Sequence, residues 1–112
     1  MDSILETLKK VIGPSASYDE FDTDLIIYAN SVFFTLNQLG VGPEEPFKIE
    51  DDSATWDNFS TDSEIEAVKA YLILKVKLYF DPPSNSSLQS AMTEQTRELE
   101  FRLNVAVDPG GT

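Results

Sequence analysis

Hydrophobic positions recur with helical spacing in four stretches of this 112-residue chain. The first stretch, Ser3 to Ile12, opens with the S-x-x-E pattern of a capping box and closes at Gly13-Pro14. Its apolar residues gather on one side of the predicted helix. We therefore expect a short amphipathic helix near the N-terminus.

The second stretch, Leu25 to Leu39, predicts a longer helix that ends at Gly40, because glycine readily takes the left-handed conformation of a helix stop. Its apolar residues cover one broad arc: Tyr28, Leu39, Val32, Leu25, Leu36, Ala29, Phe33 and Ile26. Ile27 and Phe34 break the opposite, polar side as a pair one heptad apart. Two apolar residues in register on a polar face suggest a contact, so both are candidate subunit-interface residues. Packing within the same chain is the alternative.

The third stretch, Ser63 to Phe80, opens on a second S-x-x-E pattern and ends at Asp81-Pro82-Pro83, because proline cannot donate a backbone hydrogen bond. Its main apolar stripe is Ile65, Val68, Leu72, Val76 and Tyr79, and the other side is largely apolar too, with Ala67, Ala70, Tyr71, Leu74 and Leu78. A helix that is apolar nearly all round is usually buried on two sides.

Three of the eight basic residues, Lys69, Lys75 and Lys77, lie on this third helix at angles that form no common stripe. The favoured interpretation is that each extends from a buried helix to water or pairs with an acid. The alternative is contact with an acidic surface of a neighbouring copy. On that alternative, Leu74 and Lys75 are candidate interface residues.

The fourth stretch begins near Ser86, with Gln89 as a capping partner. It carries a narrow apolar stripe of Leu88, Met92, Leu99 and Leu103. Phe101 and Val105 project away from that stripe, and Glu98 and Arg102 stand at the spacing of a helical ion pair. Residues 106–112 contain Pro and Gly and are expected to form a disordered tail, so that a single helical domain spans residues 1–105.

The connection from Gly40 to Asp62 is too long for an ordinary link between helices, and such loops usually carry function or structure. Residues 47–49 can form one short strand within it. Phe47, Trp56 and Phe59 either fold the loop back over the helices as a small core or anchor another subunit. The predicted fold is mainly α, with about four helices in a small bundle and a long structured loop between the second and third.

The composition lowers the expectation of an enzyme. The chain has no Cys and no His, which removes thiolate catalysis, the usual general base near neutral pH and the commonest nitrogen ligand for metals. Its formal net charge of -12 repels nucleic acid, although DNA can pass beside an acidic surface without sticking. No apolar run approaches a membrane span of about 20 residues, and the N-terminus lacks a signal-peptide pattern. We expect a soluble, intracellularly made chain.

The acidic loop offers the only metal-binding pattern worth weighing. Asp51, Ser53, Thr55, Asp57 and Asp62 alternate as in an EF-hand loop. The obligatory glycine of that loop is replaced by Trp56, so the sharp bend cannot form. Adjacent surface carboxylates also lack the contrasting environments that acid–base catalysis needs. We predict no catalytic residue, no metal and no cofactor.

Three blocks of sequence resemble a known family. These are "NSVFFTLNQLGVGPEEPFKIEDDSATWDNF", "VKAYLILKVKLYFDPP" and "ELEFRLN". In order and spacing, from Ser3 to Val105, they resemble the head–tail connector (adaptor) proteins of long-tailed, siphovirus-type bacteriophages and prophages. NQLGVGP, ATWDNF and YFDPP are specific in combination, although none of them encodes chemistry.

The resemblance implies a structural subunit of the virion, assembled in the cytoplasm of the bacterial host. Such subunits form a homo-oligomeric ring beneath the portal protein, extend its DNA channel and present a platform for the next stopper or tail protein. No membrane is involved. In this family the C-terminal helix commonly reaches toward the portal, which makes Phe101, Arg102 and Val105 candidate portal contacts. The segment that carries Trp56 would lie at ring or stopper contacts.

Two other functions are weighed against this one. An acidic mimic of DNA that inhibits a host nucleic-acid enzyme would need carboxylates spaced along an elongated face. Here the acids cluster in loops and helix starts, which disfavours it. The second is a metal enzyme built only from carboxylates, which calorimetry with divalent cations would test.

Overall fold

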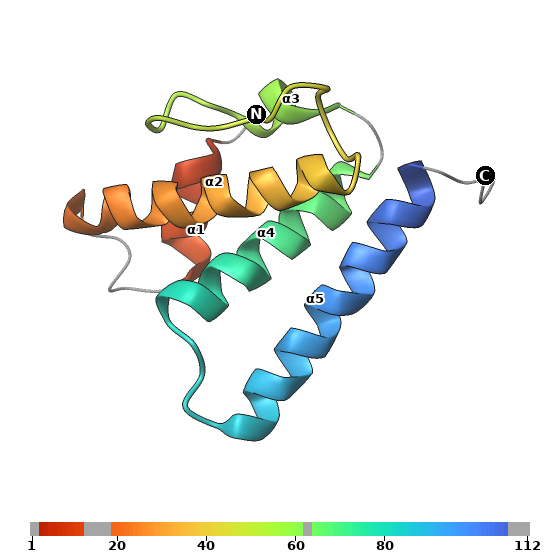
Figure 1. Cartoon of the computed structure of the whole chain (residues 1–112). Coiled ribbons are helices and arrows are strands. Elements are labelled where there is room, and N and C mark those ends of the chain that lie inside the picture. Colours follow the sequence, from red (N-terminus) through yellow and green to blue (C-terminus); the bar gives the residue numbers. More distant parts are fainter. Residues whose placement is uncertain (1–2, 13–18, 62–63, 108–112) are drawn as a thin grey trace.

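The chain folds into helices that pack around one central helix (Figure 1). The structure is a computed structural model that describes residues 3–12, 19–61 and 64–107. Its elements are α1 (Ile4–Ile12), the 3-10 turn η2 (Asp19–Phe21), α2 (Asp22–Gln38), α3 (Trp56–Phe59), α4 (Ile65–Phe80) and α5 (Ser86–Val107). The predicted mainly α fold is confirmed, with α3 as an additional short helix inside the long loop.

The short strand expected at residues 47–49 is wrong. Within the described ranges the only β-type pairing is an isolated bridge between Ser3 and Thr55. The backbone of Ile49 is engaged by a side chain instead, because Asn30 donates to the Ile49 carbonyl at 2.9 Å and accepts from its N–H at 2.7 Å. This segment therefore runs along α2 without a partner strand.

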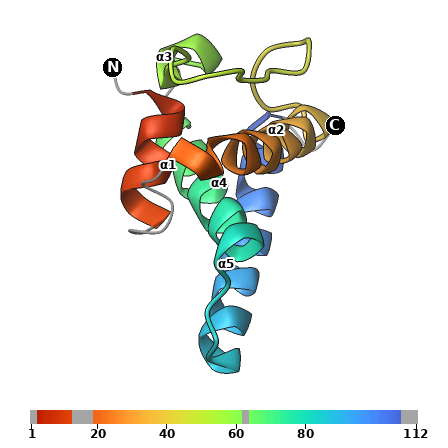
Figure 2. The same ribbon diagram turned by 90° about the vertical axis from the view of Figure 1, so that its left-hand side faces the viewer.

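The helix α4 occupies the centre, in contact with α1, α2 and α5 (Figures 1 and 2). Its buried residues are Val68, Tyr71, Leu72 and Val76. Burial on two sides is thus confirmed. Tyr79, predicted for the main stripe, is an exception, because it is 43% exposed.

On α2 the predicted division into faces is confirmed. The residues buried in the core are Leu25, Ala29, Val32, Phe33 and Leu36. Ile26, Tyr28 and Leu39 pack against this core and are partly buried. The predicted stop is confirmed as well, since Gly40 follows the helix with φ of 81°.

The helix α5 departs from the prediction in its first half, which reaches past the other helices (Figures 1 and 2). Leu88 of the predicted stripe is exposed for this reason. Thr96, which the predicted stripe did not include, is buried. The helix is capped by Asn85 rather than Ser86, because the Leu88 N–H donates to Asn85 Oδ1 at 3.0 Å. It continues to Val107, two residues past the expected domain boundary, and the rest of the expected tail lies outside the described residues.

The start of α1 is held by a side-chain cap, because the Glu6 N–H donates to Ser3 Oγ at 3.3 Å. The end of α1 is held by α4, where Lys77 Nζ donates to the Ile12 carbonyl at 3.4 Å. The capping serine expected for α4, Ser63, falls outside the described residues. Among those residues no helix combines the length and apolar content needed to cross a bilayer.

Candidate functional site

The exposed side of α2 carries the apolar pair that the sequence indicated. Ile27 is 60% and Phe34 is 56% exposed. Asp24, Ser31 and Gln38 are also exposed and alternate with them at spacings of three and four residues, so all five form one stripe along the helix. We call this stripe the α2 face.

The α2 face is electrically neutral beyond its first residue. No Asp, Glu, Lys or Arg occurs from Leu25 to Pro43, in a chain whose net charge is -12. Charged residues are depleted at the centres of protein interfaces, where they would lose hydration. An exposed face with two large apolar residues and a single charge at one end is therefore typical of a contact surface.

The aromatic residues of the loop lie inside the chain. Trp56 is fully buried and its Nε1–H donates to Thr7 Oγ1 at 3.2 Å. Phe59 is also buried and packs on Phe33 and Phe47, with ring centroids 5.2 and 5.3 Å away. The anchor alternative is therefore wrong for Trp56 and Phe59. Both belong to a core that fastens the loop to α1 and α2. Phe47 is half-buried in the same cluster.

The loop is further tied down by contacts that the sequence did not indicate. Besides Asn30, Asn37 on the next heptad donates to the Glu44 carbonyl at 3.1 Å. Gly42 has φ of 91°, and a Cβ at this position would meet the Phe59 ring at 2.4 Å. The only sign of these contacts in the sequence is that the two asparagines stand seven residues apart on one helix. Helical periodicity alone does not distinguish them from ordinary exposed polar residues.

The lysines of α4 pair within the chain, as the favoured interpretation predicted. Lys69, Lys75 and Lys77 lie 3.4, 3.9 and 3.8 Å from Glu66, Glu100 and Asp81. Lys75 thus links α4 to α5 within the chain, and we do not propose it as an intersubunit contact. Leu74 is half-buried and remains a candidate.

The same contact between α4 and α5 holds a buried tyrosine. Tyr71 Oη donates to Glu100 Oε2 at 2.6 Å. Burial, together with the hydrogen bond to the negative Glu100, raises the pKa of Tyr71 above its ordinary range. The pair fixes how α5 lies on α4.

The C-terminal half of α5 presents the candidate portal contacts. Phe101 is 70% exposed and Val105 is exposed one turn further on. Arg102 pairs with Glu98 at 2.8 Å, as the spacing predicted. Asn104 donates to the Leu39 carbonyl at 3.2 Å and so fastens this end of α5 to the end of α2. The exposed apolar residues are therefore presented on an anchored helix.

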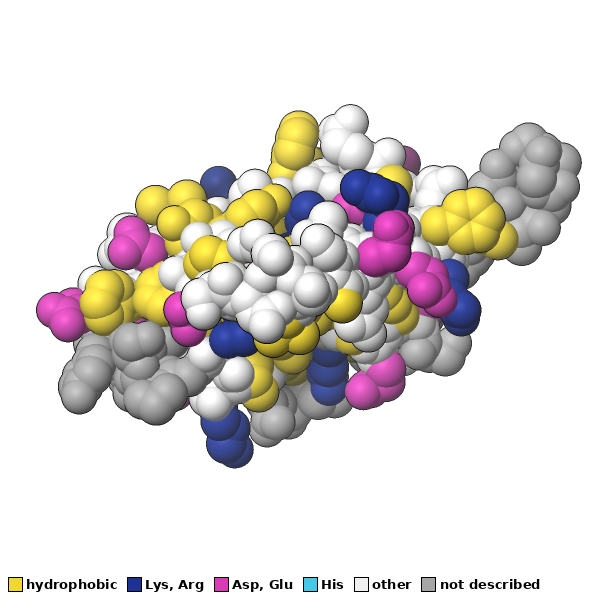
Figure 3. All heavy atoms as spheres, turned by 90° about the horizontal axis from the view of Figure 1, so that it is seen from below, with side chains coloured by type: hydrophobic (Ala, Val, Ile, Leu, Met, Phe, Trp, Pro, Cys, Tyr) yellow, Lys and Arg dark blue, Asp and Glu magenta, His cyan; other side chains and the backbone are white. Residues whose placement is uncertain are grey.

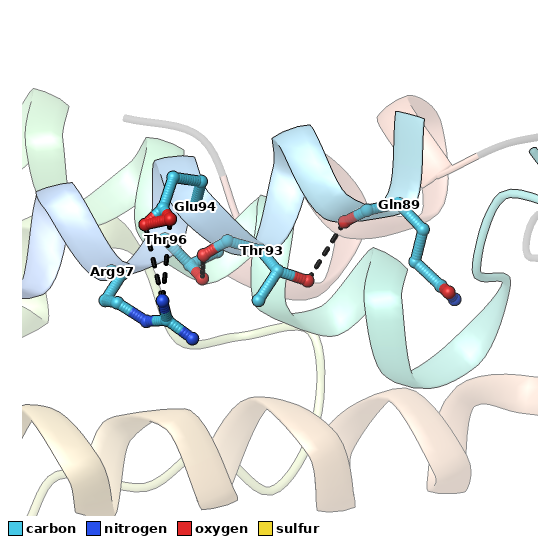
Figure 4. Close-up of polar contacts among 5 residues, drawn as sticks. All are labelled: Gln89, Thr93, Glu94, Thr96 and Arg97. Carbon is cyan, nitrogen blue, oxygen red and sulfur yellow. Dashed lines mark hydrogen bonds and ion pairs between the residues drawn. The ribbon is translucent and has the colours of Figure 1, made fainter. Parts of the chain in front are cut away.

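A groove between the end of α4 and the first half of α5 was not anticipated. It has a volume of about 500 Å³ and is lined by Leu78, Tyr79, Gln89, Ser90, Thr93, Glu94 and Arg97. Figure 4 shows its α5 wall, where Glu94 pairs with Arg97 at 3.4 Å and the Thr93 hydroxyl donates to the Gln89 carbonyl at 2.9 Å. Its only signal in the sequence is weak, because it consists of a run of small polar residues in one helix and two apolar residues in another.

Within its described part, the acidic loop does not gather ligands for a metal, and Asp62 of the EF-hand-like pattern lies outside the described residues. Asp51 instead closes a turn by accepting hydrogen bonds from the Ser53 hydroxyl and backbone N–H, which lower the pKa of Asp51. In the parts of the chain that the structure describes, no three acidic residues come together as a cation site. Elsewhere, acidic, basic and apolar side chains are interspersed on the face seen in Figure 3.

The features above define a small all-helical protein whose distinctive surfaces suit contacts with other proteins. The sequence model of one family, described as phage connector protein, matches residues 4–110. No curated protein matches the chain significantly, and no solved structure does. Because the match covers nearly the whole chain, the protein belongs to the phage connector protein family.

Proposed function

We propose that this protein is a head–tail connector subunit that assembles into a ring beneath the portal. The ring extends the DNA channel and forms the platform for the next neck or tail protein. The role is structural and places the chain in the virion, after assembly in the host cytoplasm. Membership of the connector family supports the general role.

The observation that carries the ring is the α2 face. Ile27 and Phe34 lie on α2 and leave more than half of their accessible surface in water. Because each is already partly covered, burying what remains exposed recovers about 1–2 kcal/mol per side chain. In a ring, sister copies provide this cover in every subunit at once.

We assign the portal contact to the second half of α5. Phe101 and Val105 supply apolar area, and Arg102 supplies a guanidinium whose partner Glu98 lies in the same chain. Because Asn104 fastens this part of α5 to α2, a contact made here is mechanically linked to the ring contact on α2.

The charge distribution suits a conduit for DNA. Most basic side chains lie within 4.0 Å of an acidic side chain. They are Lys9, Lys69, Lys75, Lys77, Arg97 and Arg102. DNA affinity at physiological salt depends on basic groups that neutralise phosphates. A net charge of -12 with most cations already paired lets DNA pass nearby without being retained.

The proposal is tested by mixing the protein with the portal of its phage and measuring the mass of the complex by sedimentation. We expect several copies per portal with the natural sequence, and loss of that complex with Phe34→Asp at an unchanged helical circular dichroism signal. Burying one carboxylate would cost more than the contact provides.

Val11→Asp is the matched control. Val11 is also an exposed apolar residue, 48% accessible, but it lies on α1 and outside the proposed contacts. Assembly should survive this change. If the natural protein adds no mass to the portal, or if Phe34→Asp assembles as well as Val11→Asp does, the proposal is wrong.

A further inference from the structure

We infer that neighbouring copies join by packing the α2 face of one copy into the α4–α5 groove of the next. This inference rests on the proposed ring and names the two surfaces that close it. The donor surface is the stripe with Ile27 and Phe34. The acceptor is the groove whose apolar lining residues are Leu78 and Tyr79.

A closed ring needs two different complementary surfaces on each subunit. When one patch meets the same patch on a partner, the contact closes as a two-fold dimer and cannot propagate. The chain offers an exposed apolar stripe and a hollow on separate sets of residues. The stripe is on α2, and the hollow is between α4 and α5. This is the arrangement a head-to-tail contact requires.

Charge selects a second copy as the occupant. Two chains of net charge -12 repel each other and approach at least cost through surfaces that carry no net charge. The α2 face has no charged residue after Asp24. Among the residues that line the groove, the charged ones are Glu94 and Arg97, which pair at 3.4 Å. Lys75, whose Nζ lies 5.5 Å from the ring of Tyr79, is paired with Glu100 at 3.9 Å. A strongly basic partner would gain little from either surface.

The groove also has room for a large side chain of the α2 face. Ile27 and Phe34 are seven residues apart, which places them about 10 Å from one another along the helix. The groove volume of about 500 Å³ exceeds what one aromatic side chain fills. The groove lining also includes Gln89, Ser90 and Thr93, which provide neutral donors and acceptors for Ser31 and Gln38 of the α2 face.

Crosslinking tests the pairing directly, because the natural chain has no cysteine. Ser31→Cys places a thiol on the α2 face between the two apolar residues, and Thr93→Cys places one in the groove. Rings formed on the portal from an equal mixture of the two variants are treated with a short bismaleimide. We expect a crosslinked dimer in the mixture and none when either variant is used alone. Glu6→Cys on α1, mixed with either variant, is the matched control and should give no product.

The outcomes separate this inference from the proposed function. Crosslinking of Ser31→Cys to itself would show a two-fold contact between α2 faces and would overturn the inference. Normal rings without a Ser31–Thr93 product would overturn it as well, while leaving the proposed function intact. Absence of any ring with the natural protein would remove both.

Salt provides an independent measurement on the natural protein. Self-association between like-charged copies through neutral surfaces should strengthen as salt rises, since salt screens their mutual repulsion. Phe34→Asp should weaken it at least about tenfold at every salt concentration. Weakening of self-association by salt would instead indicate attraction between opposite charges and would contradict the inference.

Discussion

Replacing Gly42 by alanine tests whether packing on one ring holds the loop after α2. Gly42 has φ of 91°, and a Cβ would lie 2.4 Å from Cζ and 2.7 Å from Cε1 of Phe59. The positive φ alone costs about 1–2 kcal/mol for an L-residue. Forcing the buried ring of Phe59 aside adds about 1–3 kcal/mol. We expect the free energy of unfolding to fall by about 2–5 kcal/mol.

The assay is thermal unfolding followed by helical circular dichroism and by the fluorescence of Trp56, the only tryptophan, which is buried beside the loop. One kcal/mol corresponds to about 4–8 °C for a domain of up to about 100 residues. The melting temperature of Gly42→Ala should therefore fall by at least about 8 °C. Gly40→Ala is the matched control, because Gly40 has a similar φ of 81° but does not lie under the ring. Equal losses in the two variants would refute the packing argument.

Four further substitutions test the contacts inside the chain. Asn30→Ala should lower the free energy of unfolding by about 2–3 kcal/mol in urea titrations, because it leaves both backbone groups of buried Ile49 unpaired. Asn37→Ala, whose loop contacts are exposed, should cost less than about 1 kcal/mol, and equal losses would contradict this account. Trp56→Phe removes the indole donor and should cost about 1–3 kcal/mol without loss of helix, whereas an unchanged urea midpoint would show that the bond contributes nothing. The raised pKa of Tyr71 means that its stabilisation is complete below pH 10.0 and declines as the pH rises further, so Tyr71→Phe should lose less stability on alkaline titration than the natural protein.

The helices and their buried faces could be predicted because helical periodicity records which side of each segment faces the core. On α2 this separated Leu36, inside, from Phe34, outside, although they are two residues apart. It was less successful on α5, where Leu88 fits the apolar stripe but lies beyond the reach of the other helices. How far a helix extends beyond its neighbours depends on where those neighbours pack. The hydrophobic periodicity of the helix itself does not contain this information.

The fixation of the loop could not be predicted, because it rests on contacts between distant residues without a repeating pattern. Asn30 and Ile49 are 19 positions apart, and Trp56 and Thr7 are 49 positions apart. For Trp56 the sequence left two interpretations open, an inner core and a subunit anchor. Only the position of α1 decides between them, since α1 provides the hydroxyl that accepts the indole N–H.

The candidate site was predicted in part for a similar reason. An apolar pair on a polar helical face is visible in one segment, so Ile27 and Phe34 could be found. The groove needs Leu78 and Tyr79 from one helix and residues such as Thr93 from the next, and their relative placement follows from tertiary packing. An exposed apolar stripe can be identified from the sequence of one helix. A groove between two helices can be identified only when their relative placement is known.

The central claim is that sister copies cover apolar surface that one copy leaves exposed. Electron cryomicroscopy of the protein bound to the portal of its phage tests it most directly. The account predicts a closed ring of identical copies below the portal, with Phe34 enclosed between each pair of neighbours. A single copy bound alone, or a ring in which Phe34 still faces water, would contradict the claim.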